Sequence, residues 1–155
     1  MQALRHPGND AGAAIPGRES MLRALRDEVR VPIHSSDDII GSRVRGRELA
    51  LALGFSPNET TLIVAAISEL ARNIVSYAGS GEIVIGKPEN NRGIIVVAQD
   101  AGPGIVNIGQ ALLDGFSTSG GLGIGLPGIR RLMDDFHLVS EPGHGTTVTV
   151  AKWRR

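Results

Sequence analysis

Glycine is concentrated in three short clusters, and these clusters constrain the chain more than any other feature of its sequence. Eleven of the 21 glycines lie between Gly102 and Gly145, and eight of these eleven fall in clusters at residues 100–104, 120–125 and 143–145. Glycine permits positive φ and lets the backbone come close to a ligand. A glycine-rich loop that enters a helix also presents free N–H groups to phosphates. Taken alone, these clusters fit ligand-binding loops and flexible connections equally well.

The composition excludes several classes of protein. Sixteen Lys and Arg residues balance sixteen Asp and Glu residues, and there is one Trp, so we expect no general nucleic-acid binding, which needs a basic surface. The absence of cysteine excludes disulfides and thiolate zinc sites. No stretch approaches the roughly 20 apolar residues that span a bilayer, and no apolar signal region begins the chain. We therefore expect a cytoplasmic protein without a membrane partner.

The 155 residues allow one domain with one sizeable core. Residues 1–28 contain glycines and prolines that break any hydrophobic period. We predict that they form a mobile N-terminal extension with one short helix over residues 20–28. The folded domain is then predicted to cover residues 29–155.

Strand and helix patterns alternate along this domain. Two helices have clear start signals, an acidic first turn after Ser35 or Ser36 and a capping box from Ser56 to Glu59. Gly54 and Gly79 are predicted to end them. We expect strands over residues 29–33, 82–86, 93–99, 138–139 and 146–151, and helices over residues 36–53, 57–77, 107–113 and 126–136. Residues 29–33 are predicted to form an edge strand, because Pro32 is tolerated only at an edge, and the continuously apolar residues 94–98 are predicted to be central. The other strands form one hairpin around residues 88–91 and a closing hairpin across residues 141–145, so the predicted fold is α+β, a two-layer sandwich with a mostly antiparallel sheet and helices on one face.

Some helix faces are also predicted. In the first long helix, five apolar residues are predicted to lie roughly on one side: Ile39, Ile40, Val44, Leu49 and Leu53. In the last helix, the 3.6-residue period includes Leu126, Ile129, Leu132, Met133 and Phe136. These residues would face the sheet.

The common phosphate-binding motifs do not fit the glycines. Gly86-Lys87 is followed by Pro88 rather than by Ser or Thr, which excludes a P-loop. Gly123 and Gly125 begin a formal dinucleotide fingerprint, but a loop and not a strand precedes it.

Glu69 and Asn73 add a second kind of signal. They lie at positions i and i+4 of the predicted second helix, so their side chains share one face one turn apart. An Asn oxygen suits Mg²⁺ beside phosphates, and a nearby carboxylate can accept a proton from a hydroxyl nucleophile. Taken alone, this pair is more often an ordinary polar stripe on an amphipathic helix.

Together the clusters resemble the motifs of the GHKL ATP-binding fold, which occurs in DNA gyrase, an ATP-dependent heat-shock chaperone, histidine kinases and MutL. Glu69-Leu-Ala-Arg-Asn73 resembles the N box, and Asp100-x-Gly-x-Gly104 resembles the G1 box. Gly121-x-Gly-x-Gly125 resembles the G2 box, and Gly145-Thr-Thr147 resembles the terminal Gly-Thr. The order and the spacing agree, and the resemblance covers residues 29–155.

The resemblance implies a ligand and residue roles. Asp100 would bind the adenine amino group of ATP, and Asn73 would hold Mg²⁺. Thr146 would hydrogen-bond near adenine, although Thr147 is an alternative and both fit plain strand propensity. The glycines would let the chain turn beneath the base, at Gly102 and Gly104, and would present N–H groups to the phosphates, at Gly121, Gly123 and Gly125.

Within this family, the chain is most similar to the RsbT-type serine kinases of the stressosome. The similarity includes Glu69-Leu-Ala-Arg-Asn-Ile74, Asp100-x-Gly-Pro-Gly-Ile105 and the glycine-rich stretch from Asp114 to Asp134. It implies transfer of the ATP γ-phosphate to Ser or Thr of a STAS-domain antagonist protein, with Glu69 as the candidate base. The released kinase would then activate a metal-dependent serine phosphatase. The first 28 residues are the departure from this family.

Two alternatives stay open. The first is an anti-sigma factor kinase with the same ATP site and a surface for a sigma factor. The second is a non-catalytic, nucleotide-dependent binding module. A lid over residues 106–120 is expected to close on ATP, and its Ser117, Thr118 and Ser119 are interpreted as lid residues because no His base accompanies them.

Overall fold

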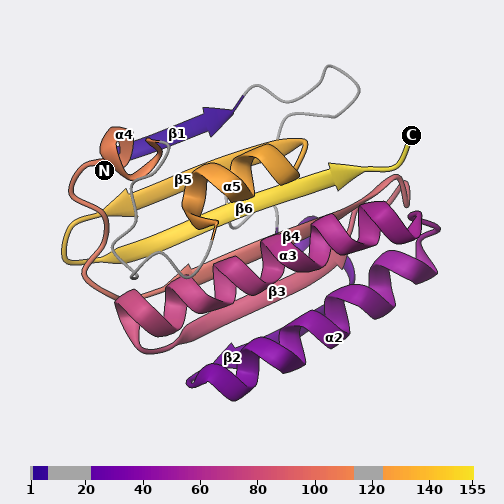
Figure 1. The fold of residues 1–155 in the computed structure, drawn as a ribbon, viewed down its shortest axis with the longest axis horizontal. Helices are drawn as coiled ribbons and strands as arrows, with labels where there is room; N and C mark the ends of the chain where they lie inside the picture. Colours follow the sequence, from indigo (N-terminus) through magenta and orange to yellow (C-terminus); the bar gives the residue numbers. More distant parts are fainter. Residues whose placement is uncertain (1, 7–21, 114–123) are drawn as a thin grey trace.

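The computed structural model describes residues 2–6, 22–113 and 124–155, with side chains from residue 22 onward. These residues form one antiparallel sheet of six strands, in the order β1-β5-β6-β4-β3-β2 (Figure 1). The strands are β1 (Gln2–His6), β2 (Arg26–Ile33), β3 (Gly81–Lys87), β4 (Gly93–Asp100), β5 (Asp135–Glu141) and β6 (Gly145–Trp153). Every pairing between neighbours is antiparallel.

The helices form the second layer. They are α2 (Ser36–Ala52), α3 (Pro57–Asn73), the π-helical turn η1 (Ile74–Ala78), α4 (Ile108–Ala111) and α5 (Gly125–Leu132). Figure 1 shows α2, α3 and α5 lying over one face of the sheet, and α3 contacts both α2 and α5. The predicted two-layer α+β sandwich is confirmed.

The main core lies between these layers and is almost entirely aliphatic. From α3 it takes Ile63, Ile67 and Leu70, and from β2 to β6 it takes alternate residues, such as Ile83 and Ile85 of β3. The residues between them face the other side, where Val84, Ile95 and Val97 form a smaller buried cluster. This alternation follows from the two-residue period of a strand, so β4 is buried on both faces, as its continuous apolar sequence predicts.

The apolar residues predicted on one side of α2 are only partly buried. The side of α2 that packs inward carries the small residues Ser42, Gly46 and Ala50, and a Cβ on Gly46 would collide with the side chain of Ile67. Because this close approach selects small residues, Ile40 and Val44 lie outside and are 62% and 49% exposed. The other three predicted residues do contact the core: Ile39, Leu49 and Leu53.

The second long helix begins and ends as predicted. The Ser56 hydroxyl accepts a hydrogen bond from the Glu59 N–H at 3.1 Å, and Gly79, with φ of 82°, follows η1. The segment Pro57–Ala78 is long and apolar enough to cross a membrane, although no such stretch was expected. Half of the most apolar part of this segment is buried inside the protein. In this fold the segment is the core helix, which accounts for its apolar composition.

The last predicted helix is too long. The structure ends α5 at Leu132, and Met133 is already extended, with φ of −107° and ψ of 158°. Phe136 belongs to β5 and is fully buried there. A longer helix and the observed strand would both place Met133 and Phe136 in the core. The spacing of the apolar residues therefore could not show where the helix ends and the strand begins.

The two edges of the sheet differ from the sequence prediction. Strand β2 is an edge strand, as predicted, but it begins at Arg26 rather than Val29. At the opposite edge β1 pairs with β5, where the sequence analysis placed no strand. The mobility of residues 1–28 and the boundary at residue 29 stay predictions.

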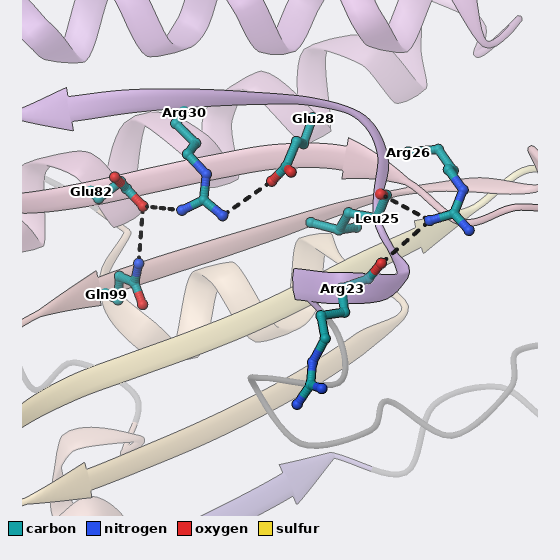
Figure 2. Close-up of polar contacts among 7 residues, drawn as sticks. All are labelled: Arg23, Leu25, Arg26, Glu28, Arg30, Glu82 and Gln99. Atoms are coloured by element: carbon teal, nitrogen blue, oxygen red, sulfur yellow. Dashed lines mark hydrogen bonds and ion pairs between the residues drawn. The ribbon is translucent and has the colours of Figure 1, made fainter.

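A polar row ties β2 to the centre of the sheet. Figure 2 shows Arg30 between Glu28 and Glu82, and Glu82 in turn beside Gln99. The Arg30 guanidinium lies 2.9 Å from Glu82 Oε1, and the Gln99 amide donates to the same oxygen at 3.0 Å. Gln99 directly precedes Asp100, so this row supports the end of β4 at the candidate site.

Candidate active site

Five of the predicted site residues line a cavity of about 540 Å³ between the helix layer and the end of the sheet. Its walls come from the end of α3 and η1, the end of β4, the start of β6, residues 103–111 and the start of α5. The predicted residues that line it are Asn73, Asp100, Gly104, Gly125 and Thr146. Apolar side chains such as Leu70, Ile74 and Val148 complete the lining, which suits a flat, weakly polar ring between a few polar groups.

Asp100 is the acidic group of this cavity. Its Oδ1 accepts a hydrogen bond from the Gly102 N–H at 2.9 Å, and its neighbour across the sheet is Thr146. Burial raises the pKa of the Asp100 carboxyl above its usual value, while hydrogen bonds from the backbone of Gly102 and Thr146 act in the opposite direction. The half-buried carboxylate is thus held by backbone and can accept a further hydrogen bond from a ligand.

Two glycines let the backbone close around Asp100. Gly104 has φ of 76° and Gly145 has φ of 103°, conformations that other residues rarely adopt. A Cβ on Gly104 would collide with the carbonyl of Glu141, and one on Gly145 would collide with the carbonyl of Asp100. The loop after β4 and the turn before β6 can lie against each other only because both positions lack a side chain.

The structure separates the two candidate threonines. Thr146 lines the cavity, whereas Thr147 is absent from its lining and lies on the other face of the sheet. The Thr146 hydroxyl lies 2.9 Å from the hydroxyl of Ser140. Ser140, which sequence reasoning missed, also accepts a hydrogen bond from the Ile105 N–H at 2.7 Å. Its position opposite Thr146 in the predicted closing hairpin was the one signal that could have found it.

Of the remaining predicted glycines, two lie within the described residues and two lie outside them. Gly102 donates to Asp100 and packs so closely on Ala78 that a Cβ would lie 2.6 Å from the Ala78 Cβ. Gly125 lines the cavity at the start of α5. Gly121 and Gly123, together with Ser117, Thr118 and Ser119 of the expected lid, lie outside the described residues.

Glu69 and Asn73 differ in their access to the cavity. Asn73 is the last residue of α3 and lines the cavity itself. Glu69, one turn earlier, is only 2% exposed and does not line the cavity. Its Oε1 accepts a hydrogen bond from the Gly125 N–H at 3.1 Å, and its Oε2 pairs with Arg72 at 2.7 Å.

The hydrogen bond between Glu69 and Gly125 occupies a backbone N–H that could bind an anion. A backbone N–H at the start of a helix is a favourable partner for any anion. In the described structure that partner is the Glu69 carboxylate, which holds α5 against α3. A phosphate that binds to the same N–H would release one carboxylate oxygen.

Comparisons with known proteins agree with this geometry. Residues 58–155 match the family described as histidine kinase-, DNA gyrase B-, and HSP90-like ATPases. The chain is 47% identical over 133 residues to the serine/threonine-protein kinase RsbT of Bacillus subtilis (strain 168), which covers 84% of this chain and 100% of that protein.

A solved structure shares the fold. It contains the RsbU and RsbW domains of a Mycobacterium tuberculosis protein, with a TM-score of 0.60 and 16% identity, over 83% of this chain and 32% of that chain. At this identity the likeness concerns the fold alone. The family match and the identity to RsbT decide the assignment: the chain belongs to the GHKL ATPases and, within them, to the RsbT-like serine/threonine-protein kinases.

Proposed function

We propose that this kinase transfers the γ-phosphate of ATP to a Ser or Thr of a STAS-domain antagonist protein in a bacterial partner-switching pathway of the stressosome type. We further propose that the kinase acts in the cytoplasm and, once released by phosphorylation of its partner, activates a metal-dependent serine phosphatase. The observation that carries the proposal is one cavity lined by Asn73, Asp100, Gly125 and Thr146, with the Glu69 carboxylate behind Gly125.

Asp100 and Thr146 form the end of the cavity that would hold adenine. The Asp100 carboxylate accepts from the Gly102 N–H and keeps acceptor capacity for the 6-amino group. The apolar side chains of Ile74 and Val148 line the same cavity and would contact the ring. Adenine would therefore be oriented by one charged acceptor inside an otherwise apolar slot.

Asn73 and Gly125 form the end that would hold the phosphates. The Asn73 amide oxygen is a hard ligand that suits Mg²⁺. No group of three His, Asp or Glu side chains within residues 22–113 and 124–155 could hold a metal by itself, so the residues fit a cation that is bound jointly with phosphate oxygens. When bound, Mg²⁺ would neutralise charge on the phosphates.

Glu69 would act as the base for the incoming hydroxyl. Its carboxylate would accept the hydroxyl proton as the substrate oxygen bonds to the γ-phosphorus and the bond from that phosphorus to the ADP oxygen breaks. In the described structure both Glu69 oxygens already have donors, Gly125 and Arg72. A phosphate that takes the Gly125 N–H would free Glu69 for this step, which would link nucleotide binding to activation of the base.

The outer face of α2 supports a protein partner. Ile40, Val44 and Leu51 are about half exposed or more and follow one another along one side of the helix. Exposed charged residues of both signs flank them, Arg43 and Arg47 on one side and Asp37 and Glu48 on the other. Exposed apolar side chains inside a charged rim are typical of protein interfaces.

Phosphotransfer to candidate partners tests the proposal. The full-length chain is incubated with labelled ATP, Mg²⁺ and each STAS-domain protein, sigma factor and serine phosphatase of its own genome, and the phosphorylated residue is mapped. We expect label on one Ser or Thr of a STAS protein, and binding of the phosphatase after that partner is phosphorylated. Stable binding of a sigma factor would favour the anti-sigma alternative. Nucleotide-dependent binding of partners without any label would favour the non-catalytic module.

A further inference from the structure

Arg72 lies on α3 between Glu69 and Asn73, and it contacts the proposed base directly. Its Nη1 lies 2.7 Å from Glu69 Oε2, across one turn of the helix. The two side chains differ in burial, since that of Glu69 is 2% exposed and that of Arg72 is 37% exposed. Arg72 does not line the cavity. It therefore reaches the site only through Glu69.

The burial of Glu69 gives this ion pair its weight. Between two exposed side chains, an ion pair three residues apart on a helix contributes little. A buried carboxylate, however, has lost the water that would donate hydrogen bonds to it, and protein donors must replace that water. Within the described residues Glu69 has two such donors, the Gly125 N–H on Oε1 and Arg72 on Oε2.

The two donors would respond differently to a nucleotide. Gly125 begins α5 and lines the cavity, and a bound phosphate would take its N–H. Arg72 is on the same helix as Glu69, so it keeps its place beside the carboxylate whichever way α5 moves. Oε2 would then stay occupied while Oε1 loses its donor. The oxygen that is freed is the one that faces the cavity wall at Gly125.

We infer that Arg72 is a positioning residue that holds Glu69 by Oε2 and so directs Oε1 at the hydroxyl of the protein substrate. The inference rests on the proposed role of Glu69 as the base. In that step the hydroxyl proton moves to Oε1, the hydroxyl oxygen bonds to the γ-phosphorus, and the bond from that phosphorus to the ADP oxygen breaks. A guanidinium suits this role because its donors lie in one rigid plane, whereas an ammonium is a single point of contact.

The first test measures phosphotransfer and ATP affinity in Arg72→Met, which keeps a long side chain but removes the donors. Single-turnover transfer to the partner that accepts label from the unaltered kinase should be about 10-fold slower or more, the size of a hydrogen bond to a charged group. ATP affinity, measured by calorimetry, should stay unchanged, because Arg72 does not line the cavity. Arg72→Lys keeps a charged donor and should transfer at an intermediate rate.

The double variant shows whether Arg72 acts through Glu69. Because Glu69→Gln already removes the base, adding Arg72→Met should slow transfer no further. A general structural role would instead multiply the two losses. If Arg72→Met does not fold, Arg72→Lys replaces it in both measurements: slower transfer at unchanged ATP affinity supports the inference, and an unchanged rate opposes it.

A matched control is Arg45→Met, an exposed arginine of α2 that does not line the cavity. It should change neither the rate nor the affinity. An unchanged rate in Arg72→Met, equal losses of rate and ATP affinity, or multiplied losses in the double variant would overturn the inference.

Glu69→Gln alone separates this inference from the proposed function. If no partner accepts label, or if Glu69→Gln transfers at the normal rate, the proposed chemistry is wrong and the role of Arg72 fails with it. If Glu69→Gln slows transfer but Arg72→Met does not, only the role of Arg72 is wrong.

Discussion

The two ends of the cavity are formed by different secondary-structure elements. The end proposed to hold adenine, called the adenine end below, lies on strands, where Asp100, Ser140 and Thr146 belong to β4, β5 and β6 and are joined by hydrogen bonds within one sheet. The end proposed to hold the phosphates, called the phosphate end below, lies where α3 ends and α5 begins, and its contact joins Glu69 to Gly125, 56 residues apart in sequence. Hydrogen bonds within the sheet fix the shape of the adenine end. At the phosphate end, a bound phosphate would have to replace the contact between Glu69 and Gly125.

The largest expected effect is on the rate of phosphotransfer, when the carboxylate at the phosphate end is removed. Glu69→Gln should lower phosphotransfer at least about 100-fold, because a general base contributes roughly 10²- to 10⁴-fold. ATP affinity should stay within a few-fold, since Glu69 does not line the cavity and the amide oxygen can still accept from Gly125. Single-turnover transfer and calorimetry measure the two quantities.

The control for Glu69→Gln is Glu89→Gln, an exposed residue in the turn between β3 and β4. It should transfer phosphate at the rate of the unaltered protein. Normal transfer by Glu69→Gln would remove Glu69 as the base and would leave only its contact with Gly125 to explain its burial.

The second effect is on stability, when a side chain is added to the backbone at the adenine end. Gly145→Ala should lower the free energy of unfolding by about 2–4 kcal/mol, because it combines positive φ with a collision against the Asp100 carbonyl. Gly143→Ala is the matched control, since Gly143 also has positive φ but has open space where the Cβ would be. It should cost only about 1 kcal/mol. Urea unfolding measures both, and equal losses would show that strain alone, and not close packing, requires glycine at Gly145.

The smallest effect concerns the charge of Asp100. At neutral pH, Asp100→Asn should weaken ATP binding about 10-fold, the size of one charge-assisted hydrogen bond. Because burial raises the pKa of Asp100 above 3.8, this advantage of the unaltered protein should shrink as pH falls through that raised pKa. Comparing the two proteins at each pH cancels the titration of the ATP phosphates.

The raised pKa of Asp100 also predicts how the stability of the protein changes with pH. A carboxyl with a raised pKa binds its proton more tightly when folded, so its contribution to stability falls as pH rises from 3.8 through the folded pKa. Relative to Asp100→Asn, the unaltered protein should therefore gain stability on acidification. The opposite trend in thermal unfolding would mean that the hydrogen bonds from Gly102 and Thr146 outweigh burial.

Local signals predicted most of the fold. The capping box at Ser56 and Glu59 and the hairpin around residues 88–91 are each determined by a few neighbouring residues, and the structure has both elements where the sequence predicts them. The grouping of Asn73, Asp100 and Thr146 came from motif resemblance. The structure brings these residues to one cavity, while their roles stay predictions.

The misses share a physical cause, which is contact between residues distant in sequence. The inward face of α2 is decided by its close approach to Ile67, and not by the apolar period of α2 itself. Phe136 is buried from a strand because β6 pairs with it through Val150. Ser140 matters only because folding places it between Ile105 and Thr146. No local pattern records such contacts.

The first strand has a consequence for handling the protein. Gln2–His6 pairs with β5 along the outer edge of the sheet, and Gln2 is the register partner of Ser140. Without β1, the strand that holds Ser140 would present a row of unpaired backbone groups, the kind of open edge on which chains associate and aggregate. Removing β1 would therefore act on solubility and on the strand that carries Ser140 together, whereas β6 ends at the far end of the sheet (Figure 1), where an affinity tag would leave this edge covered.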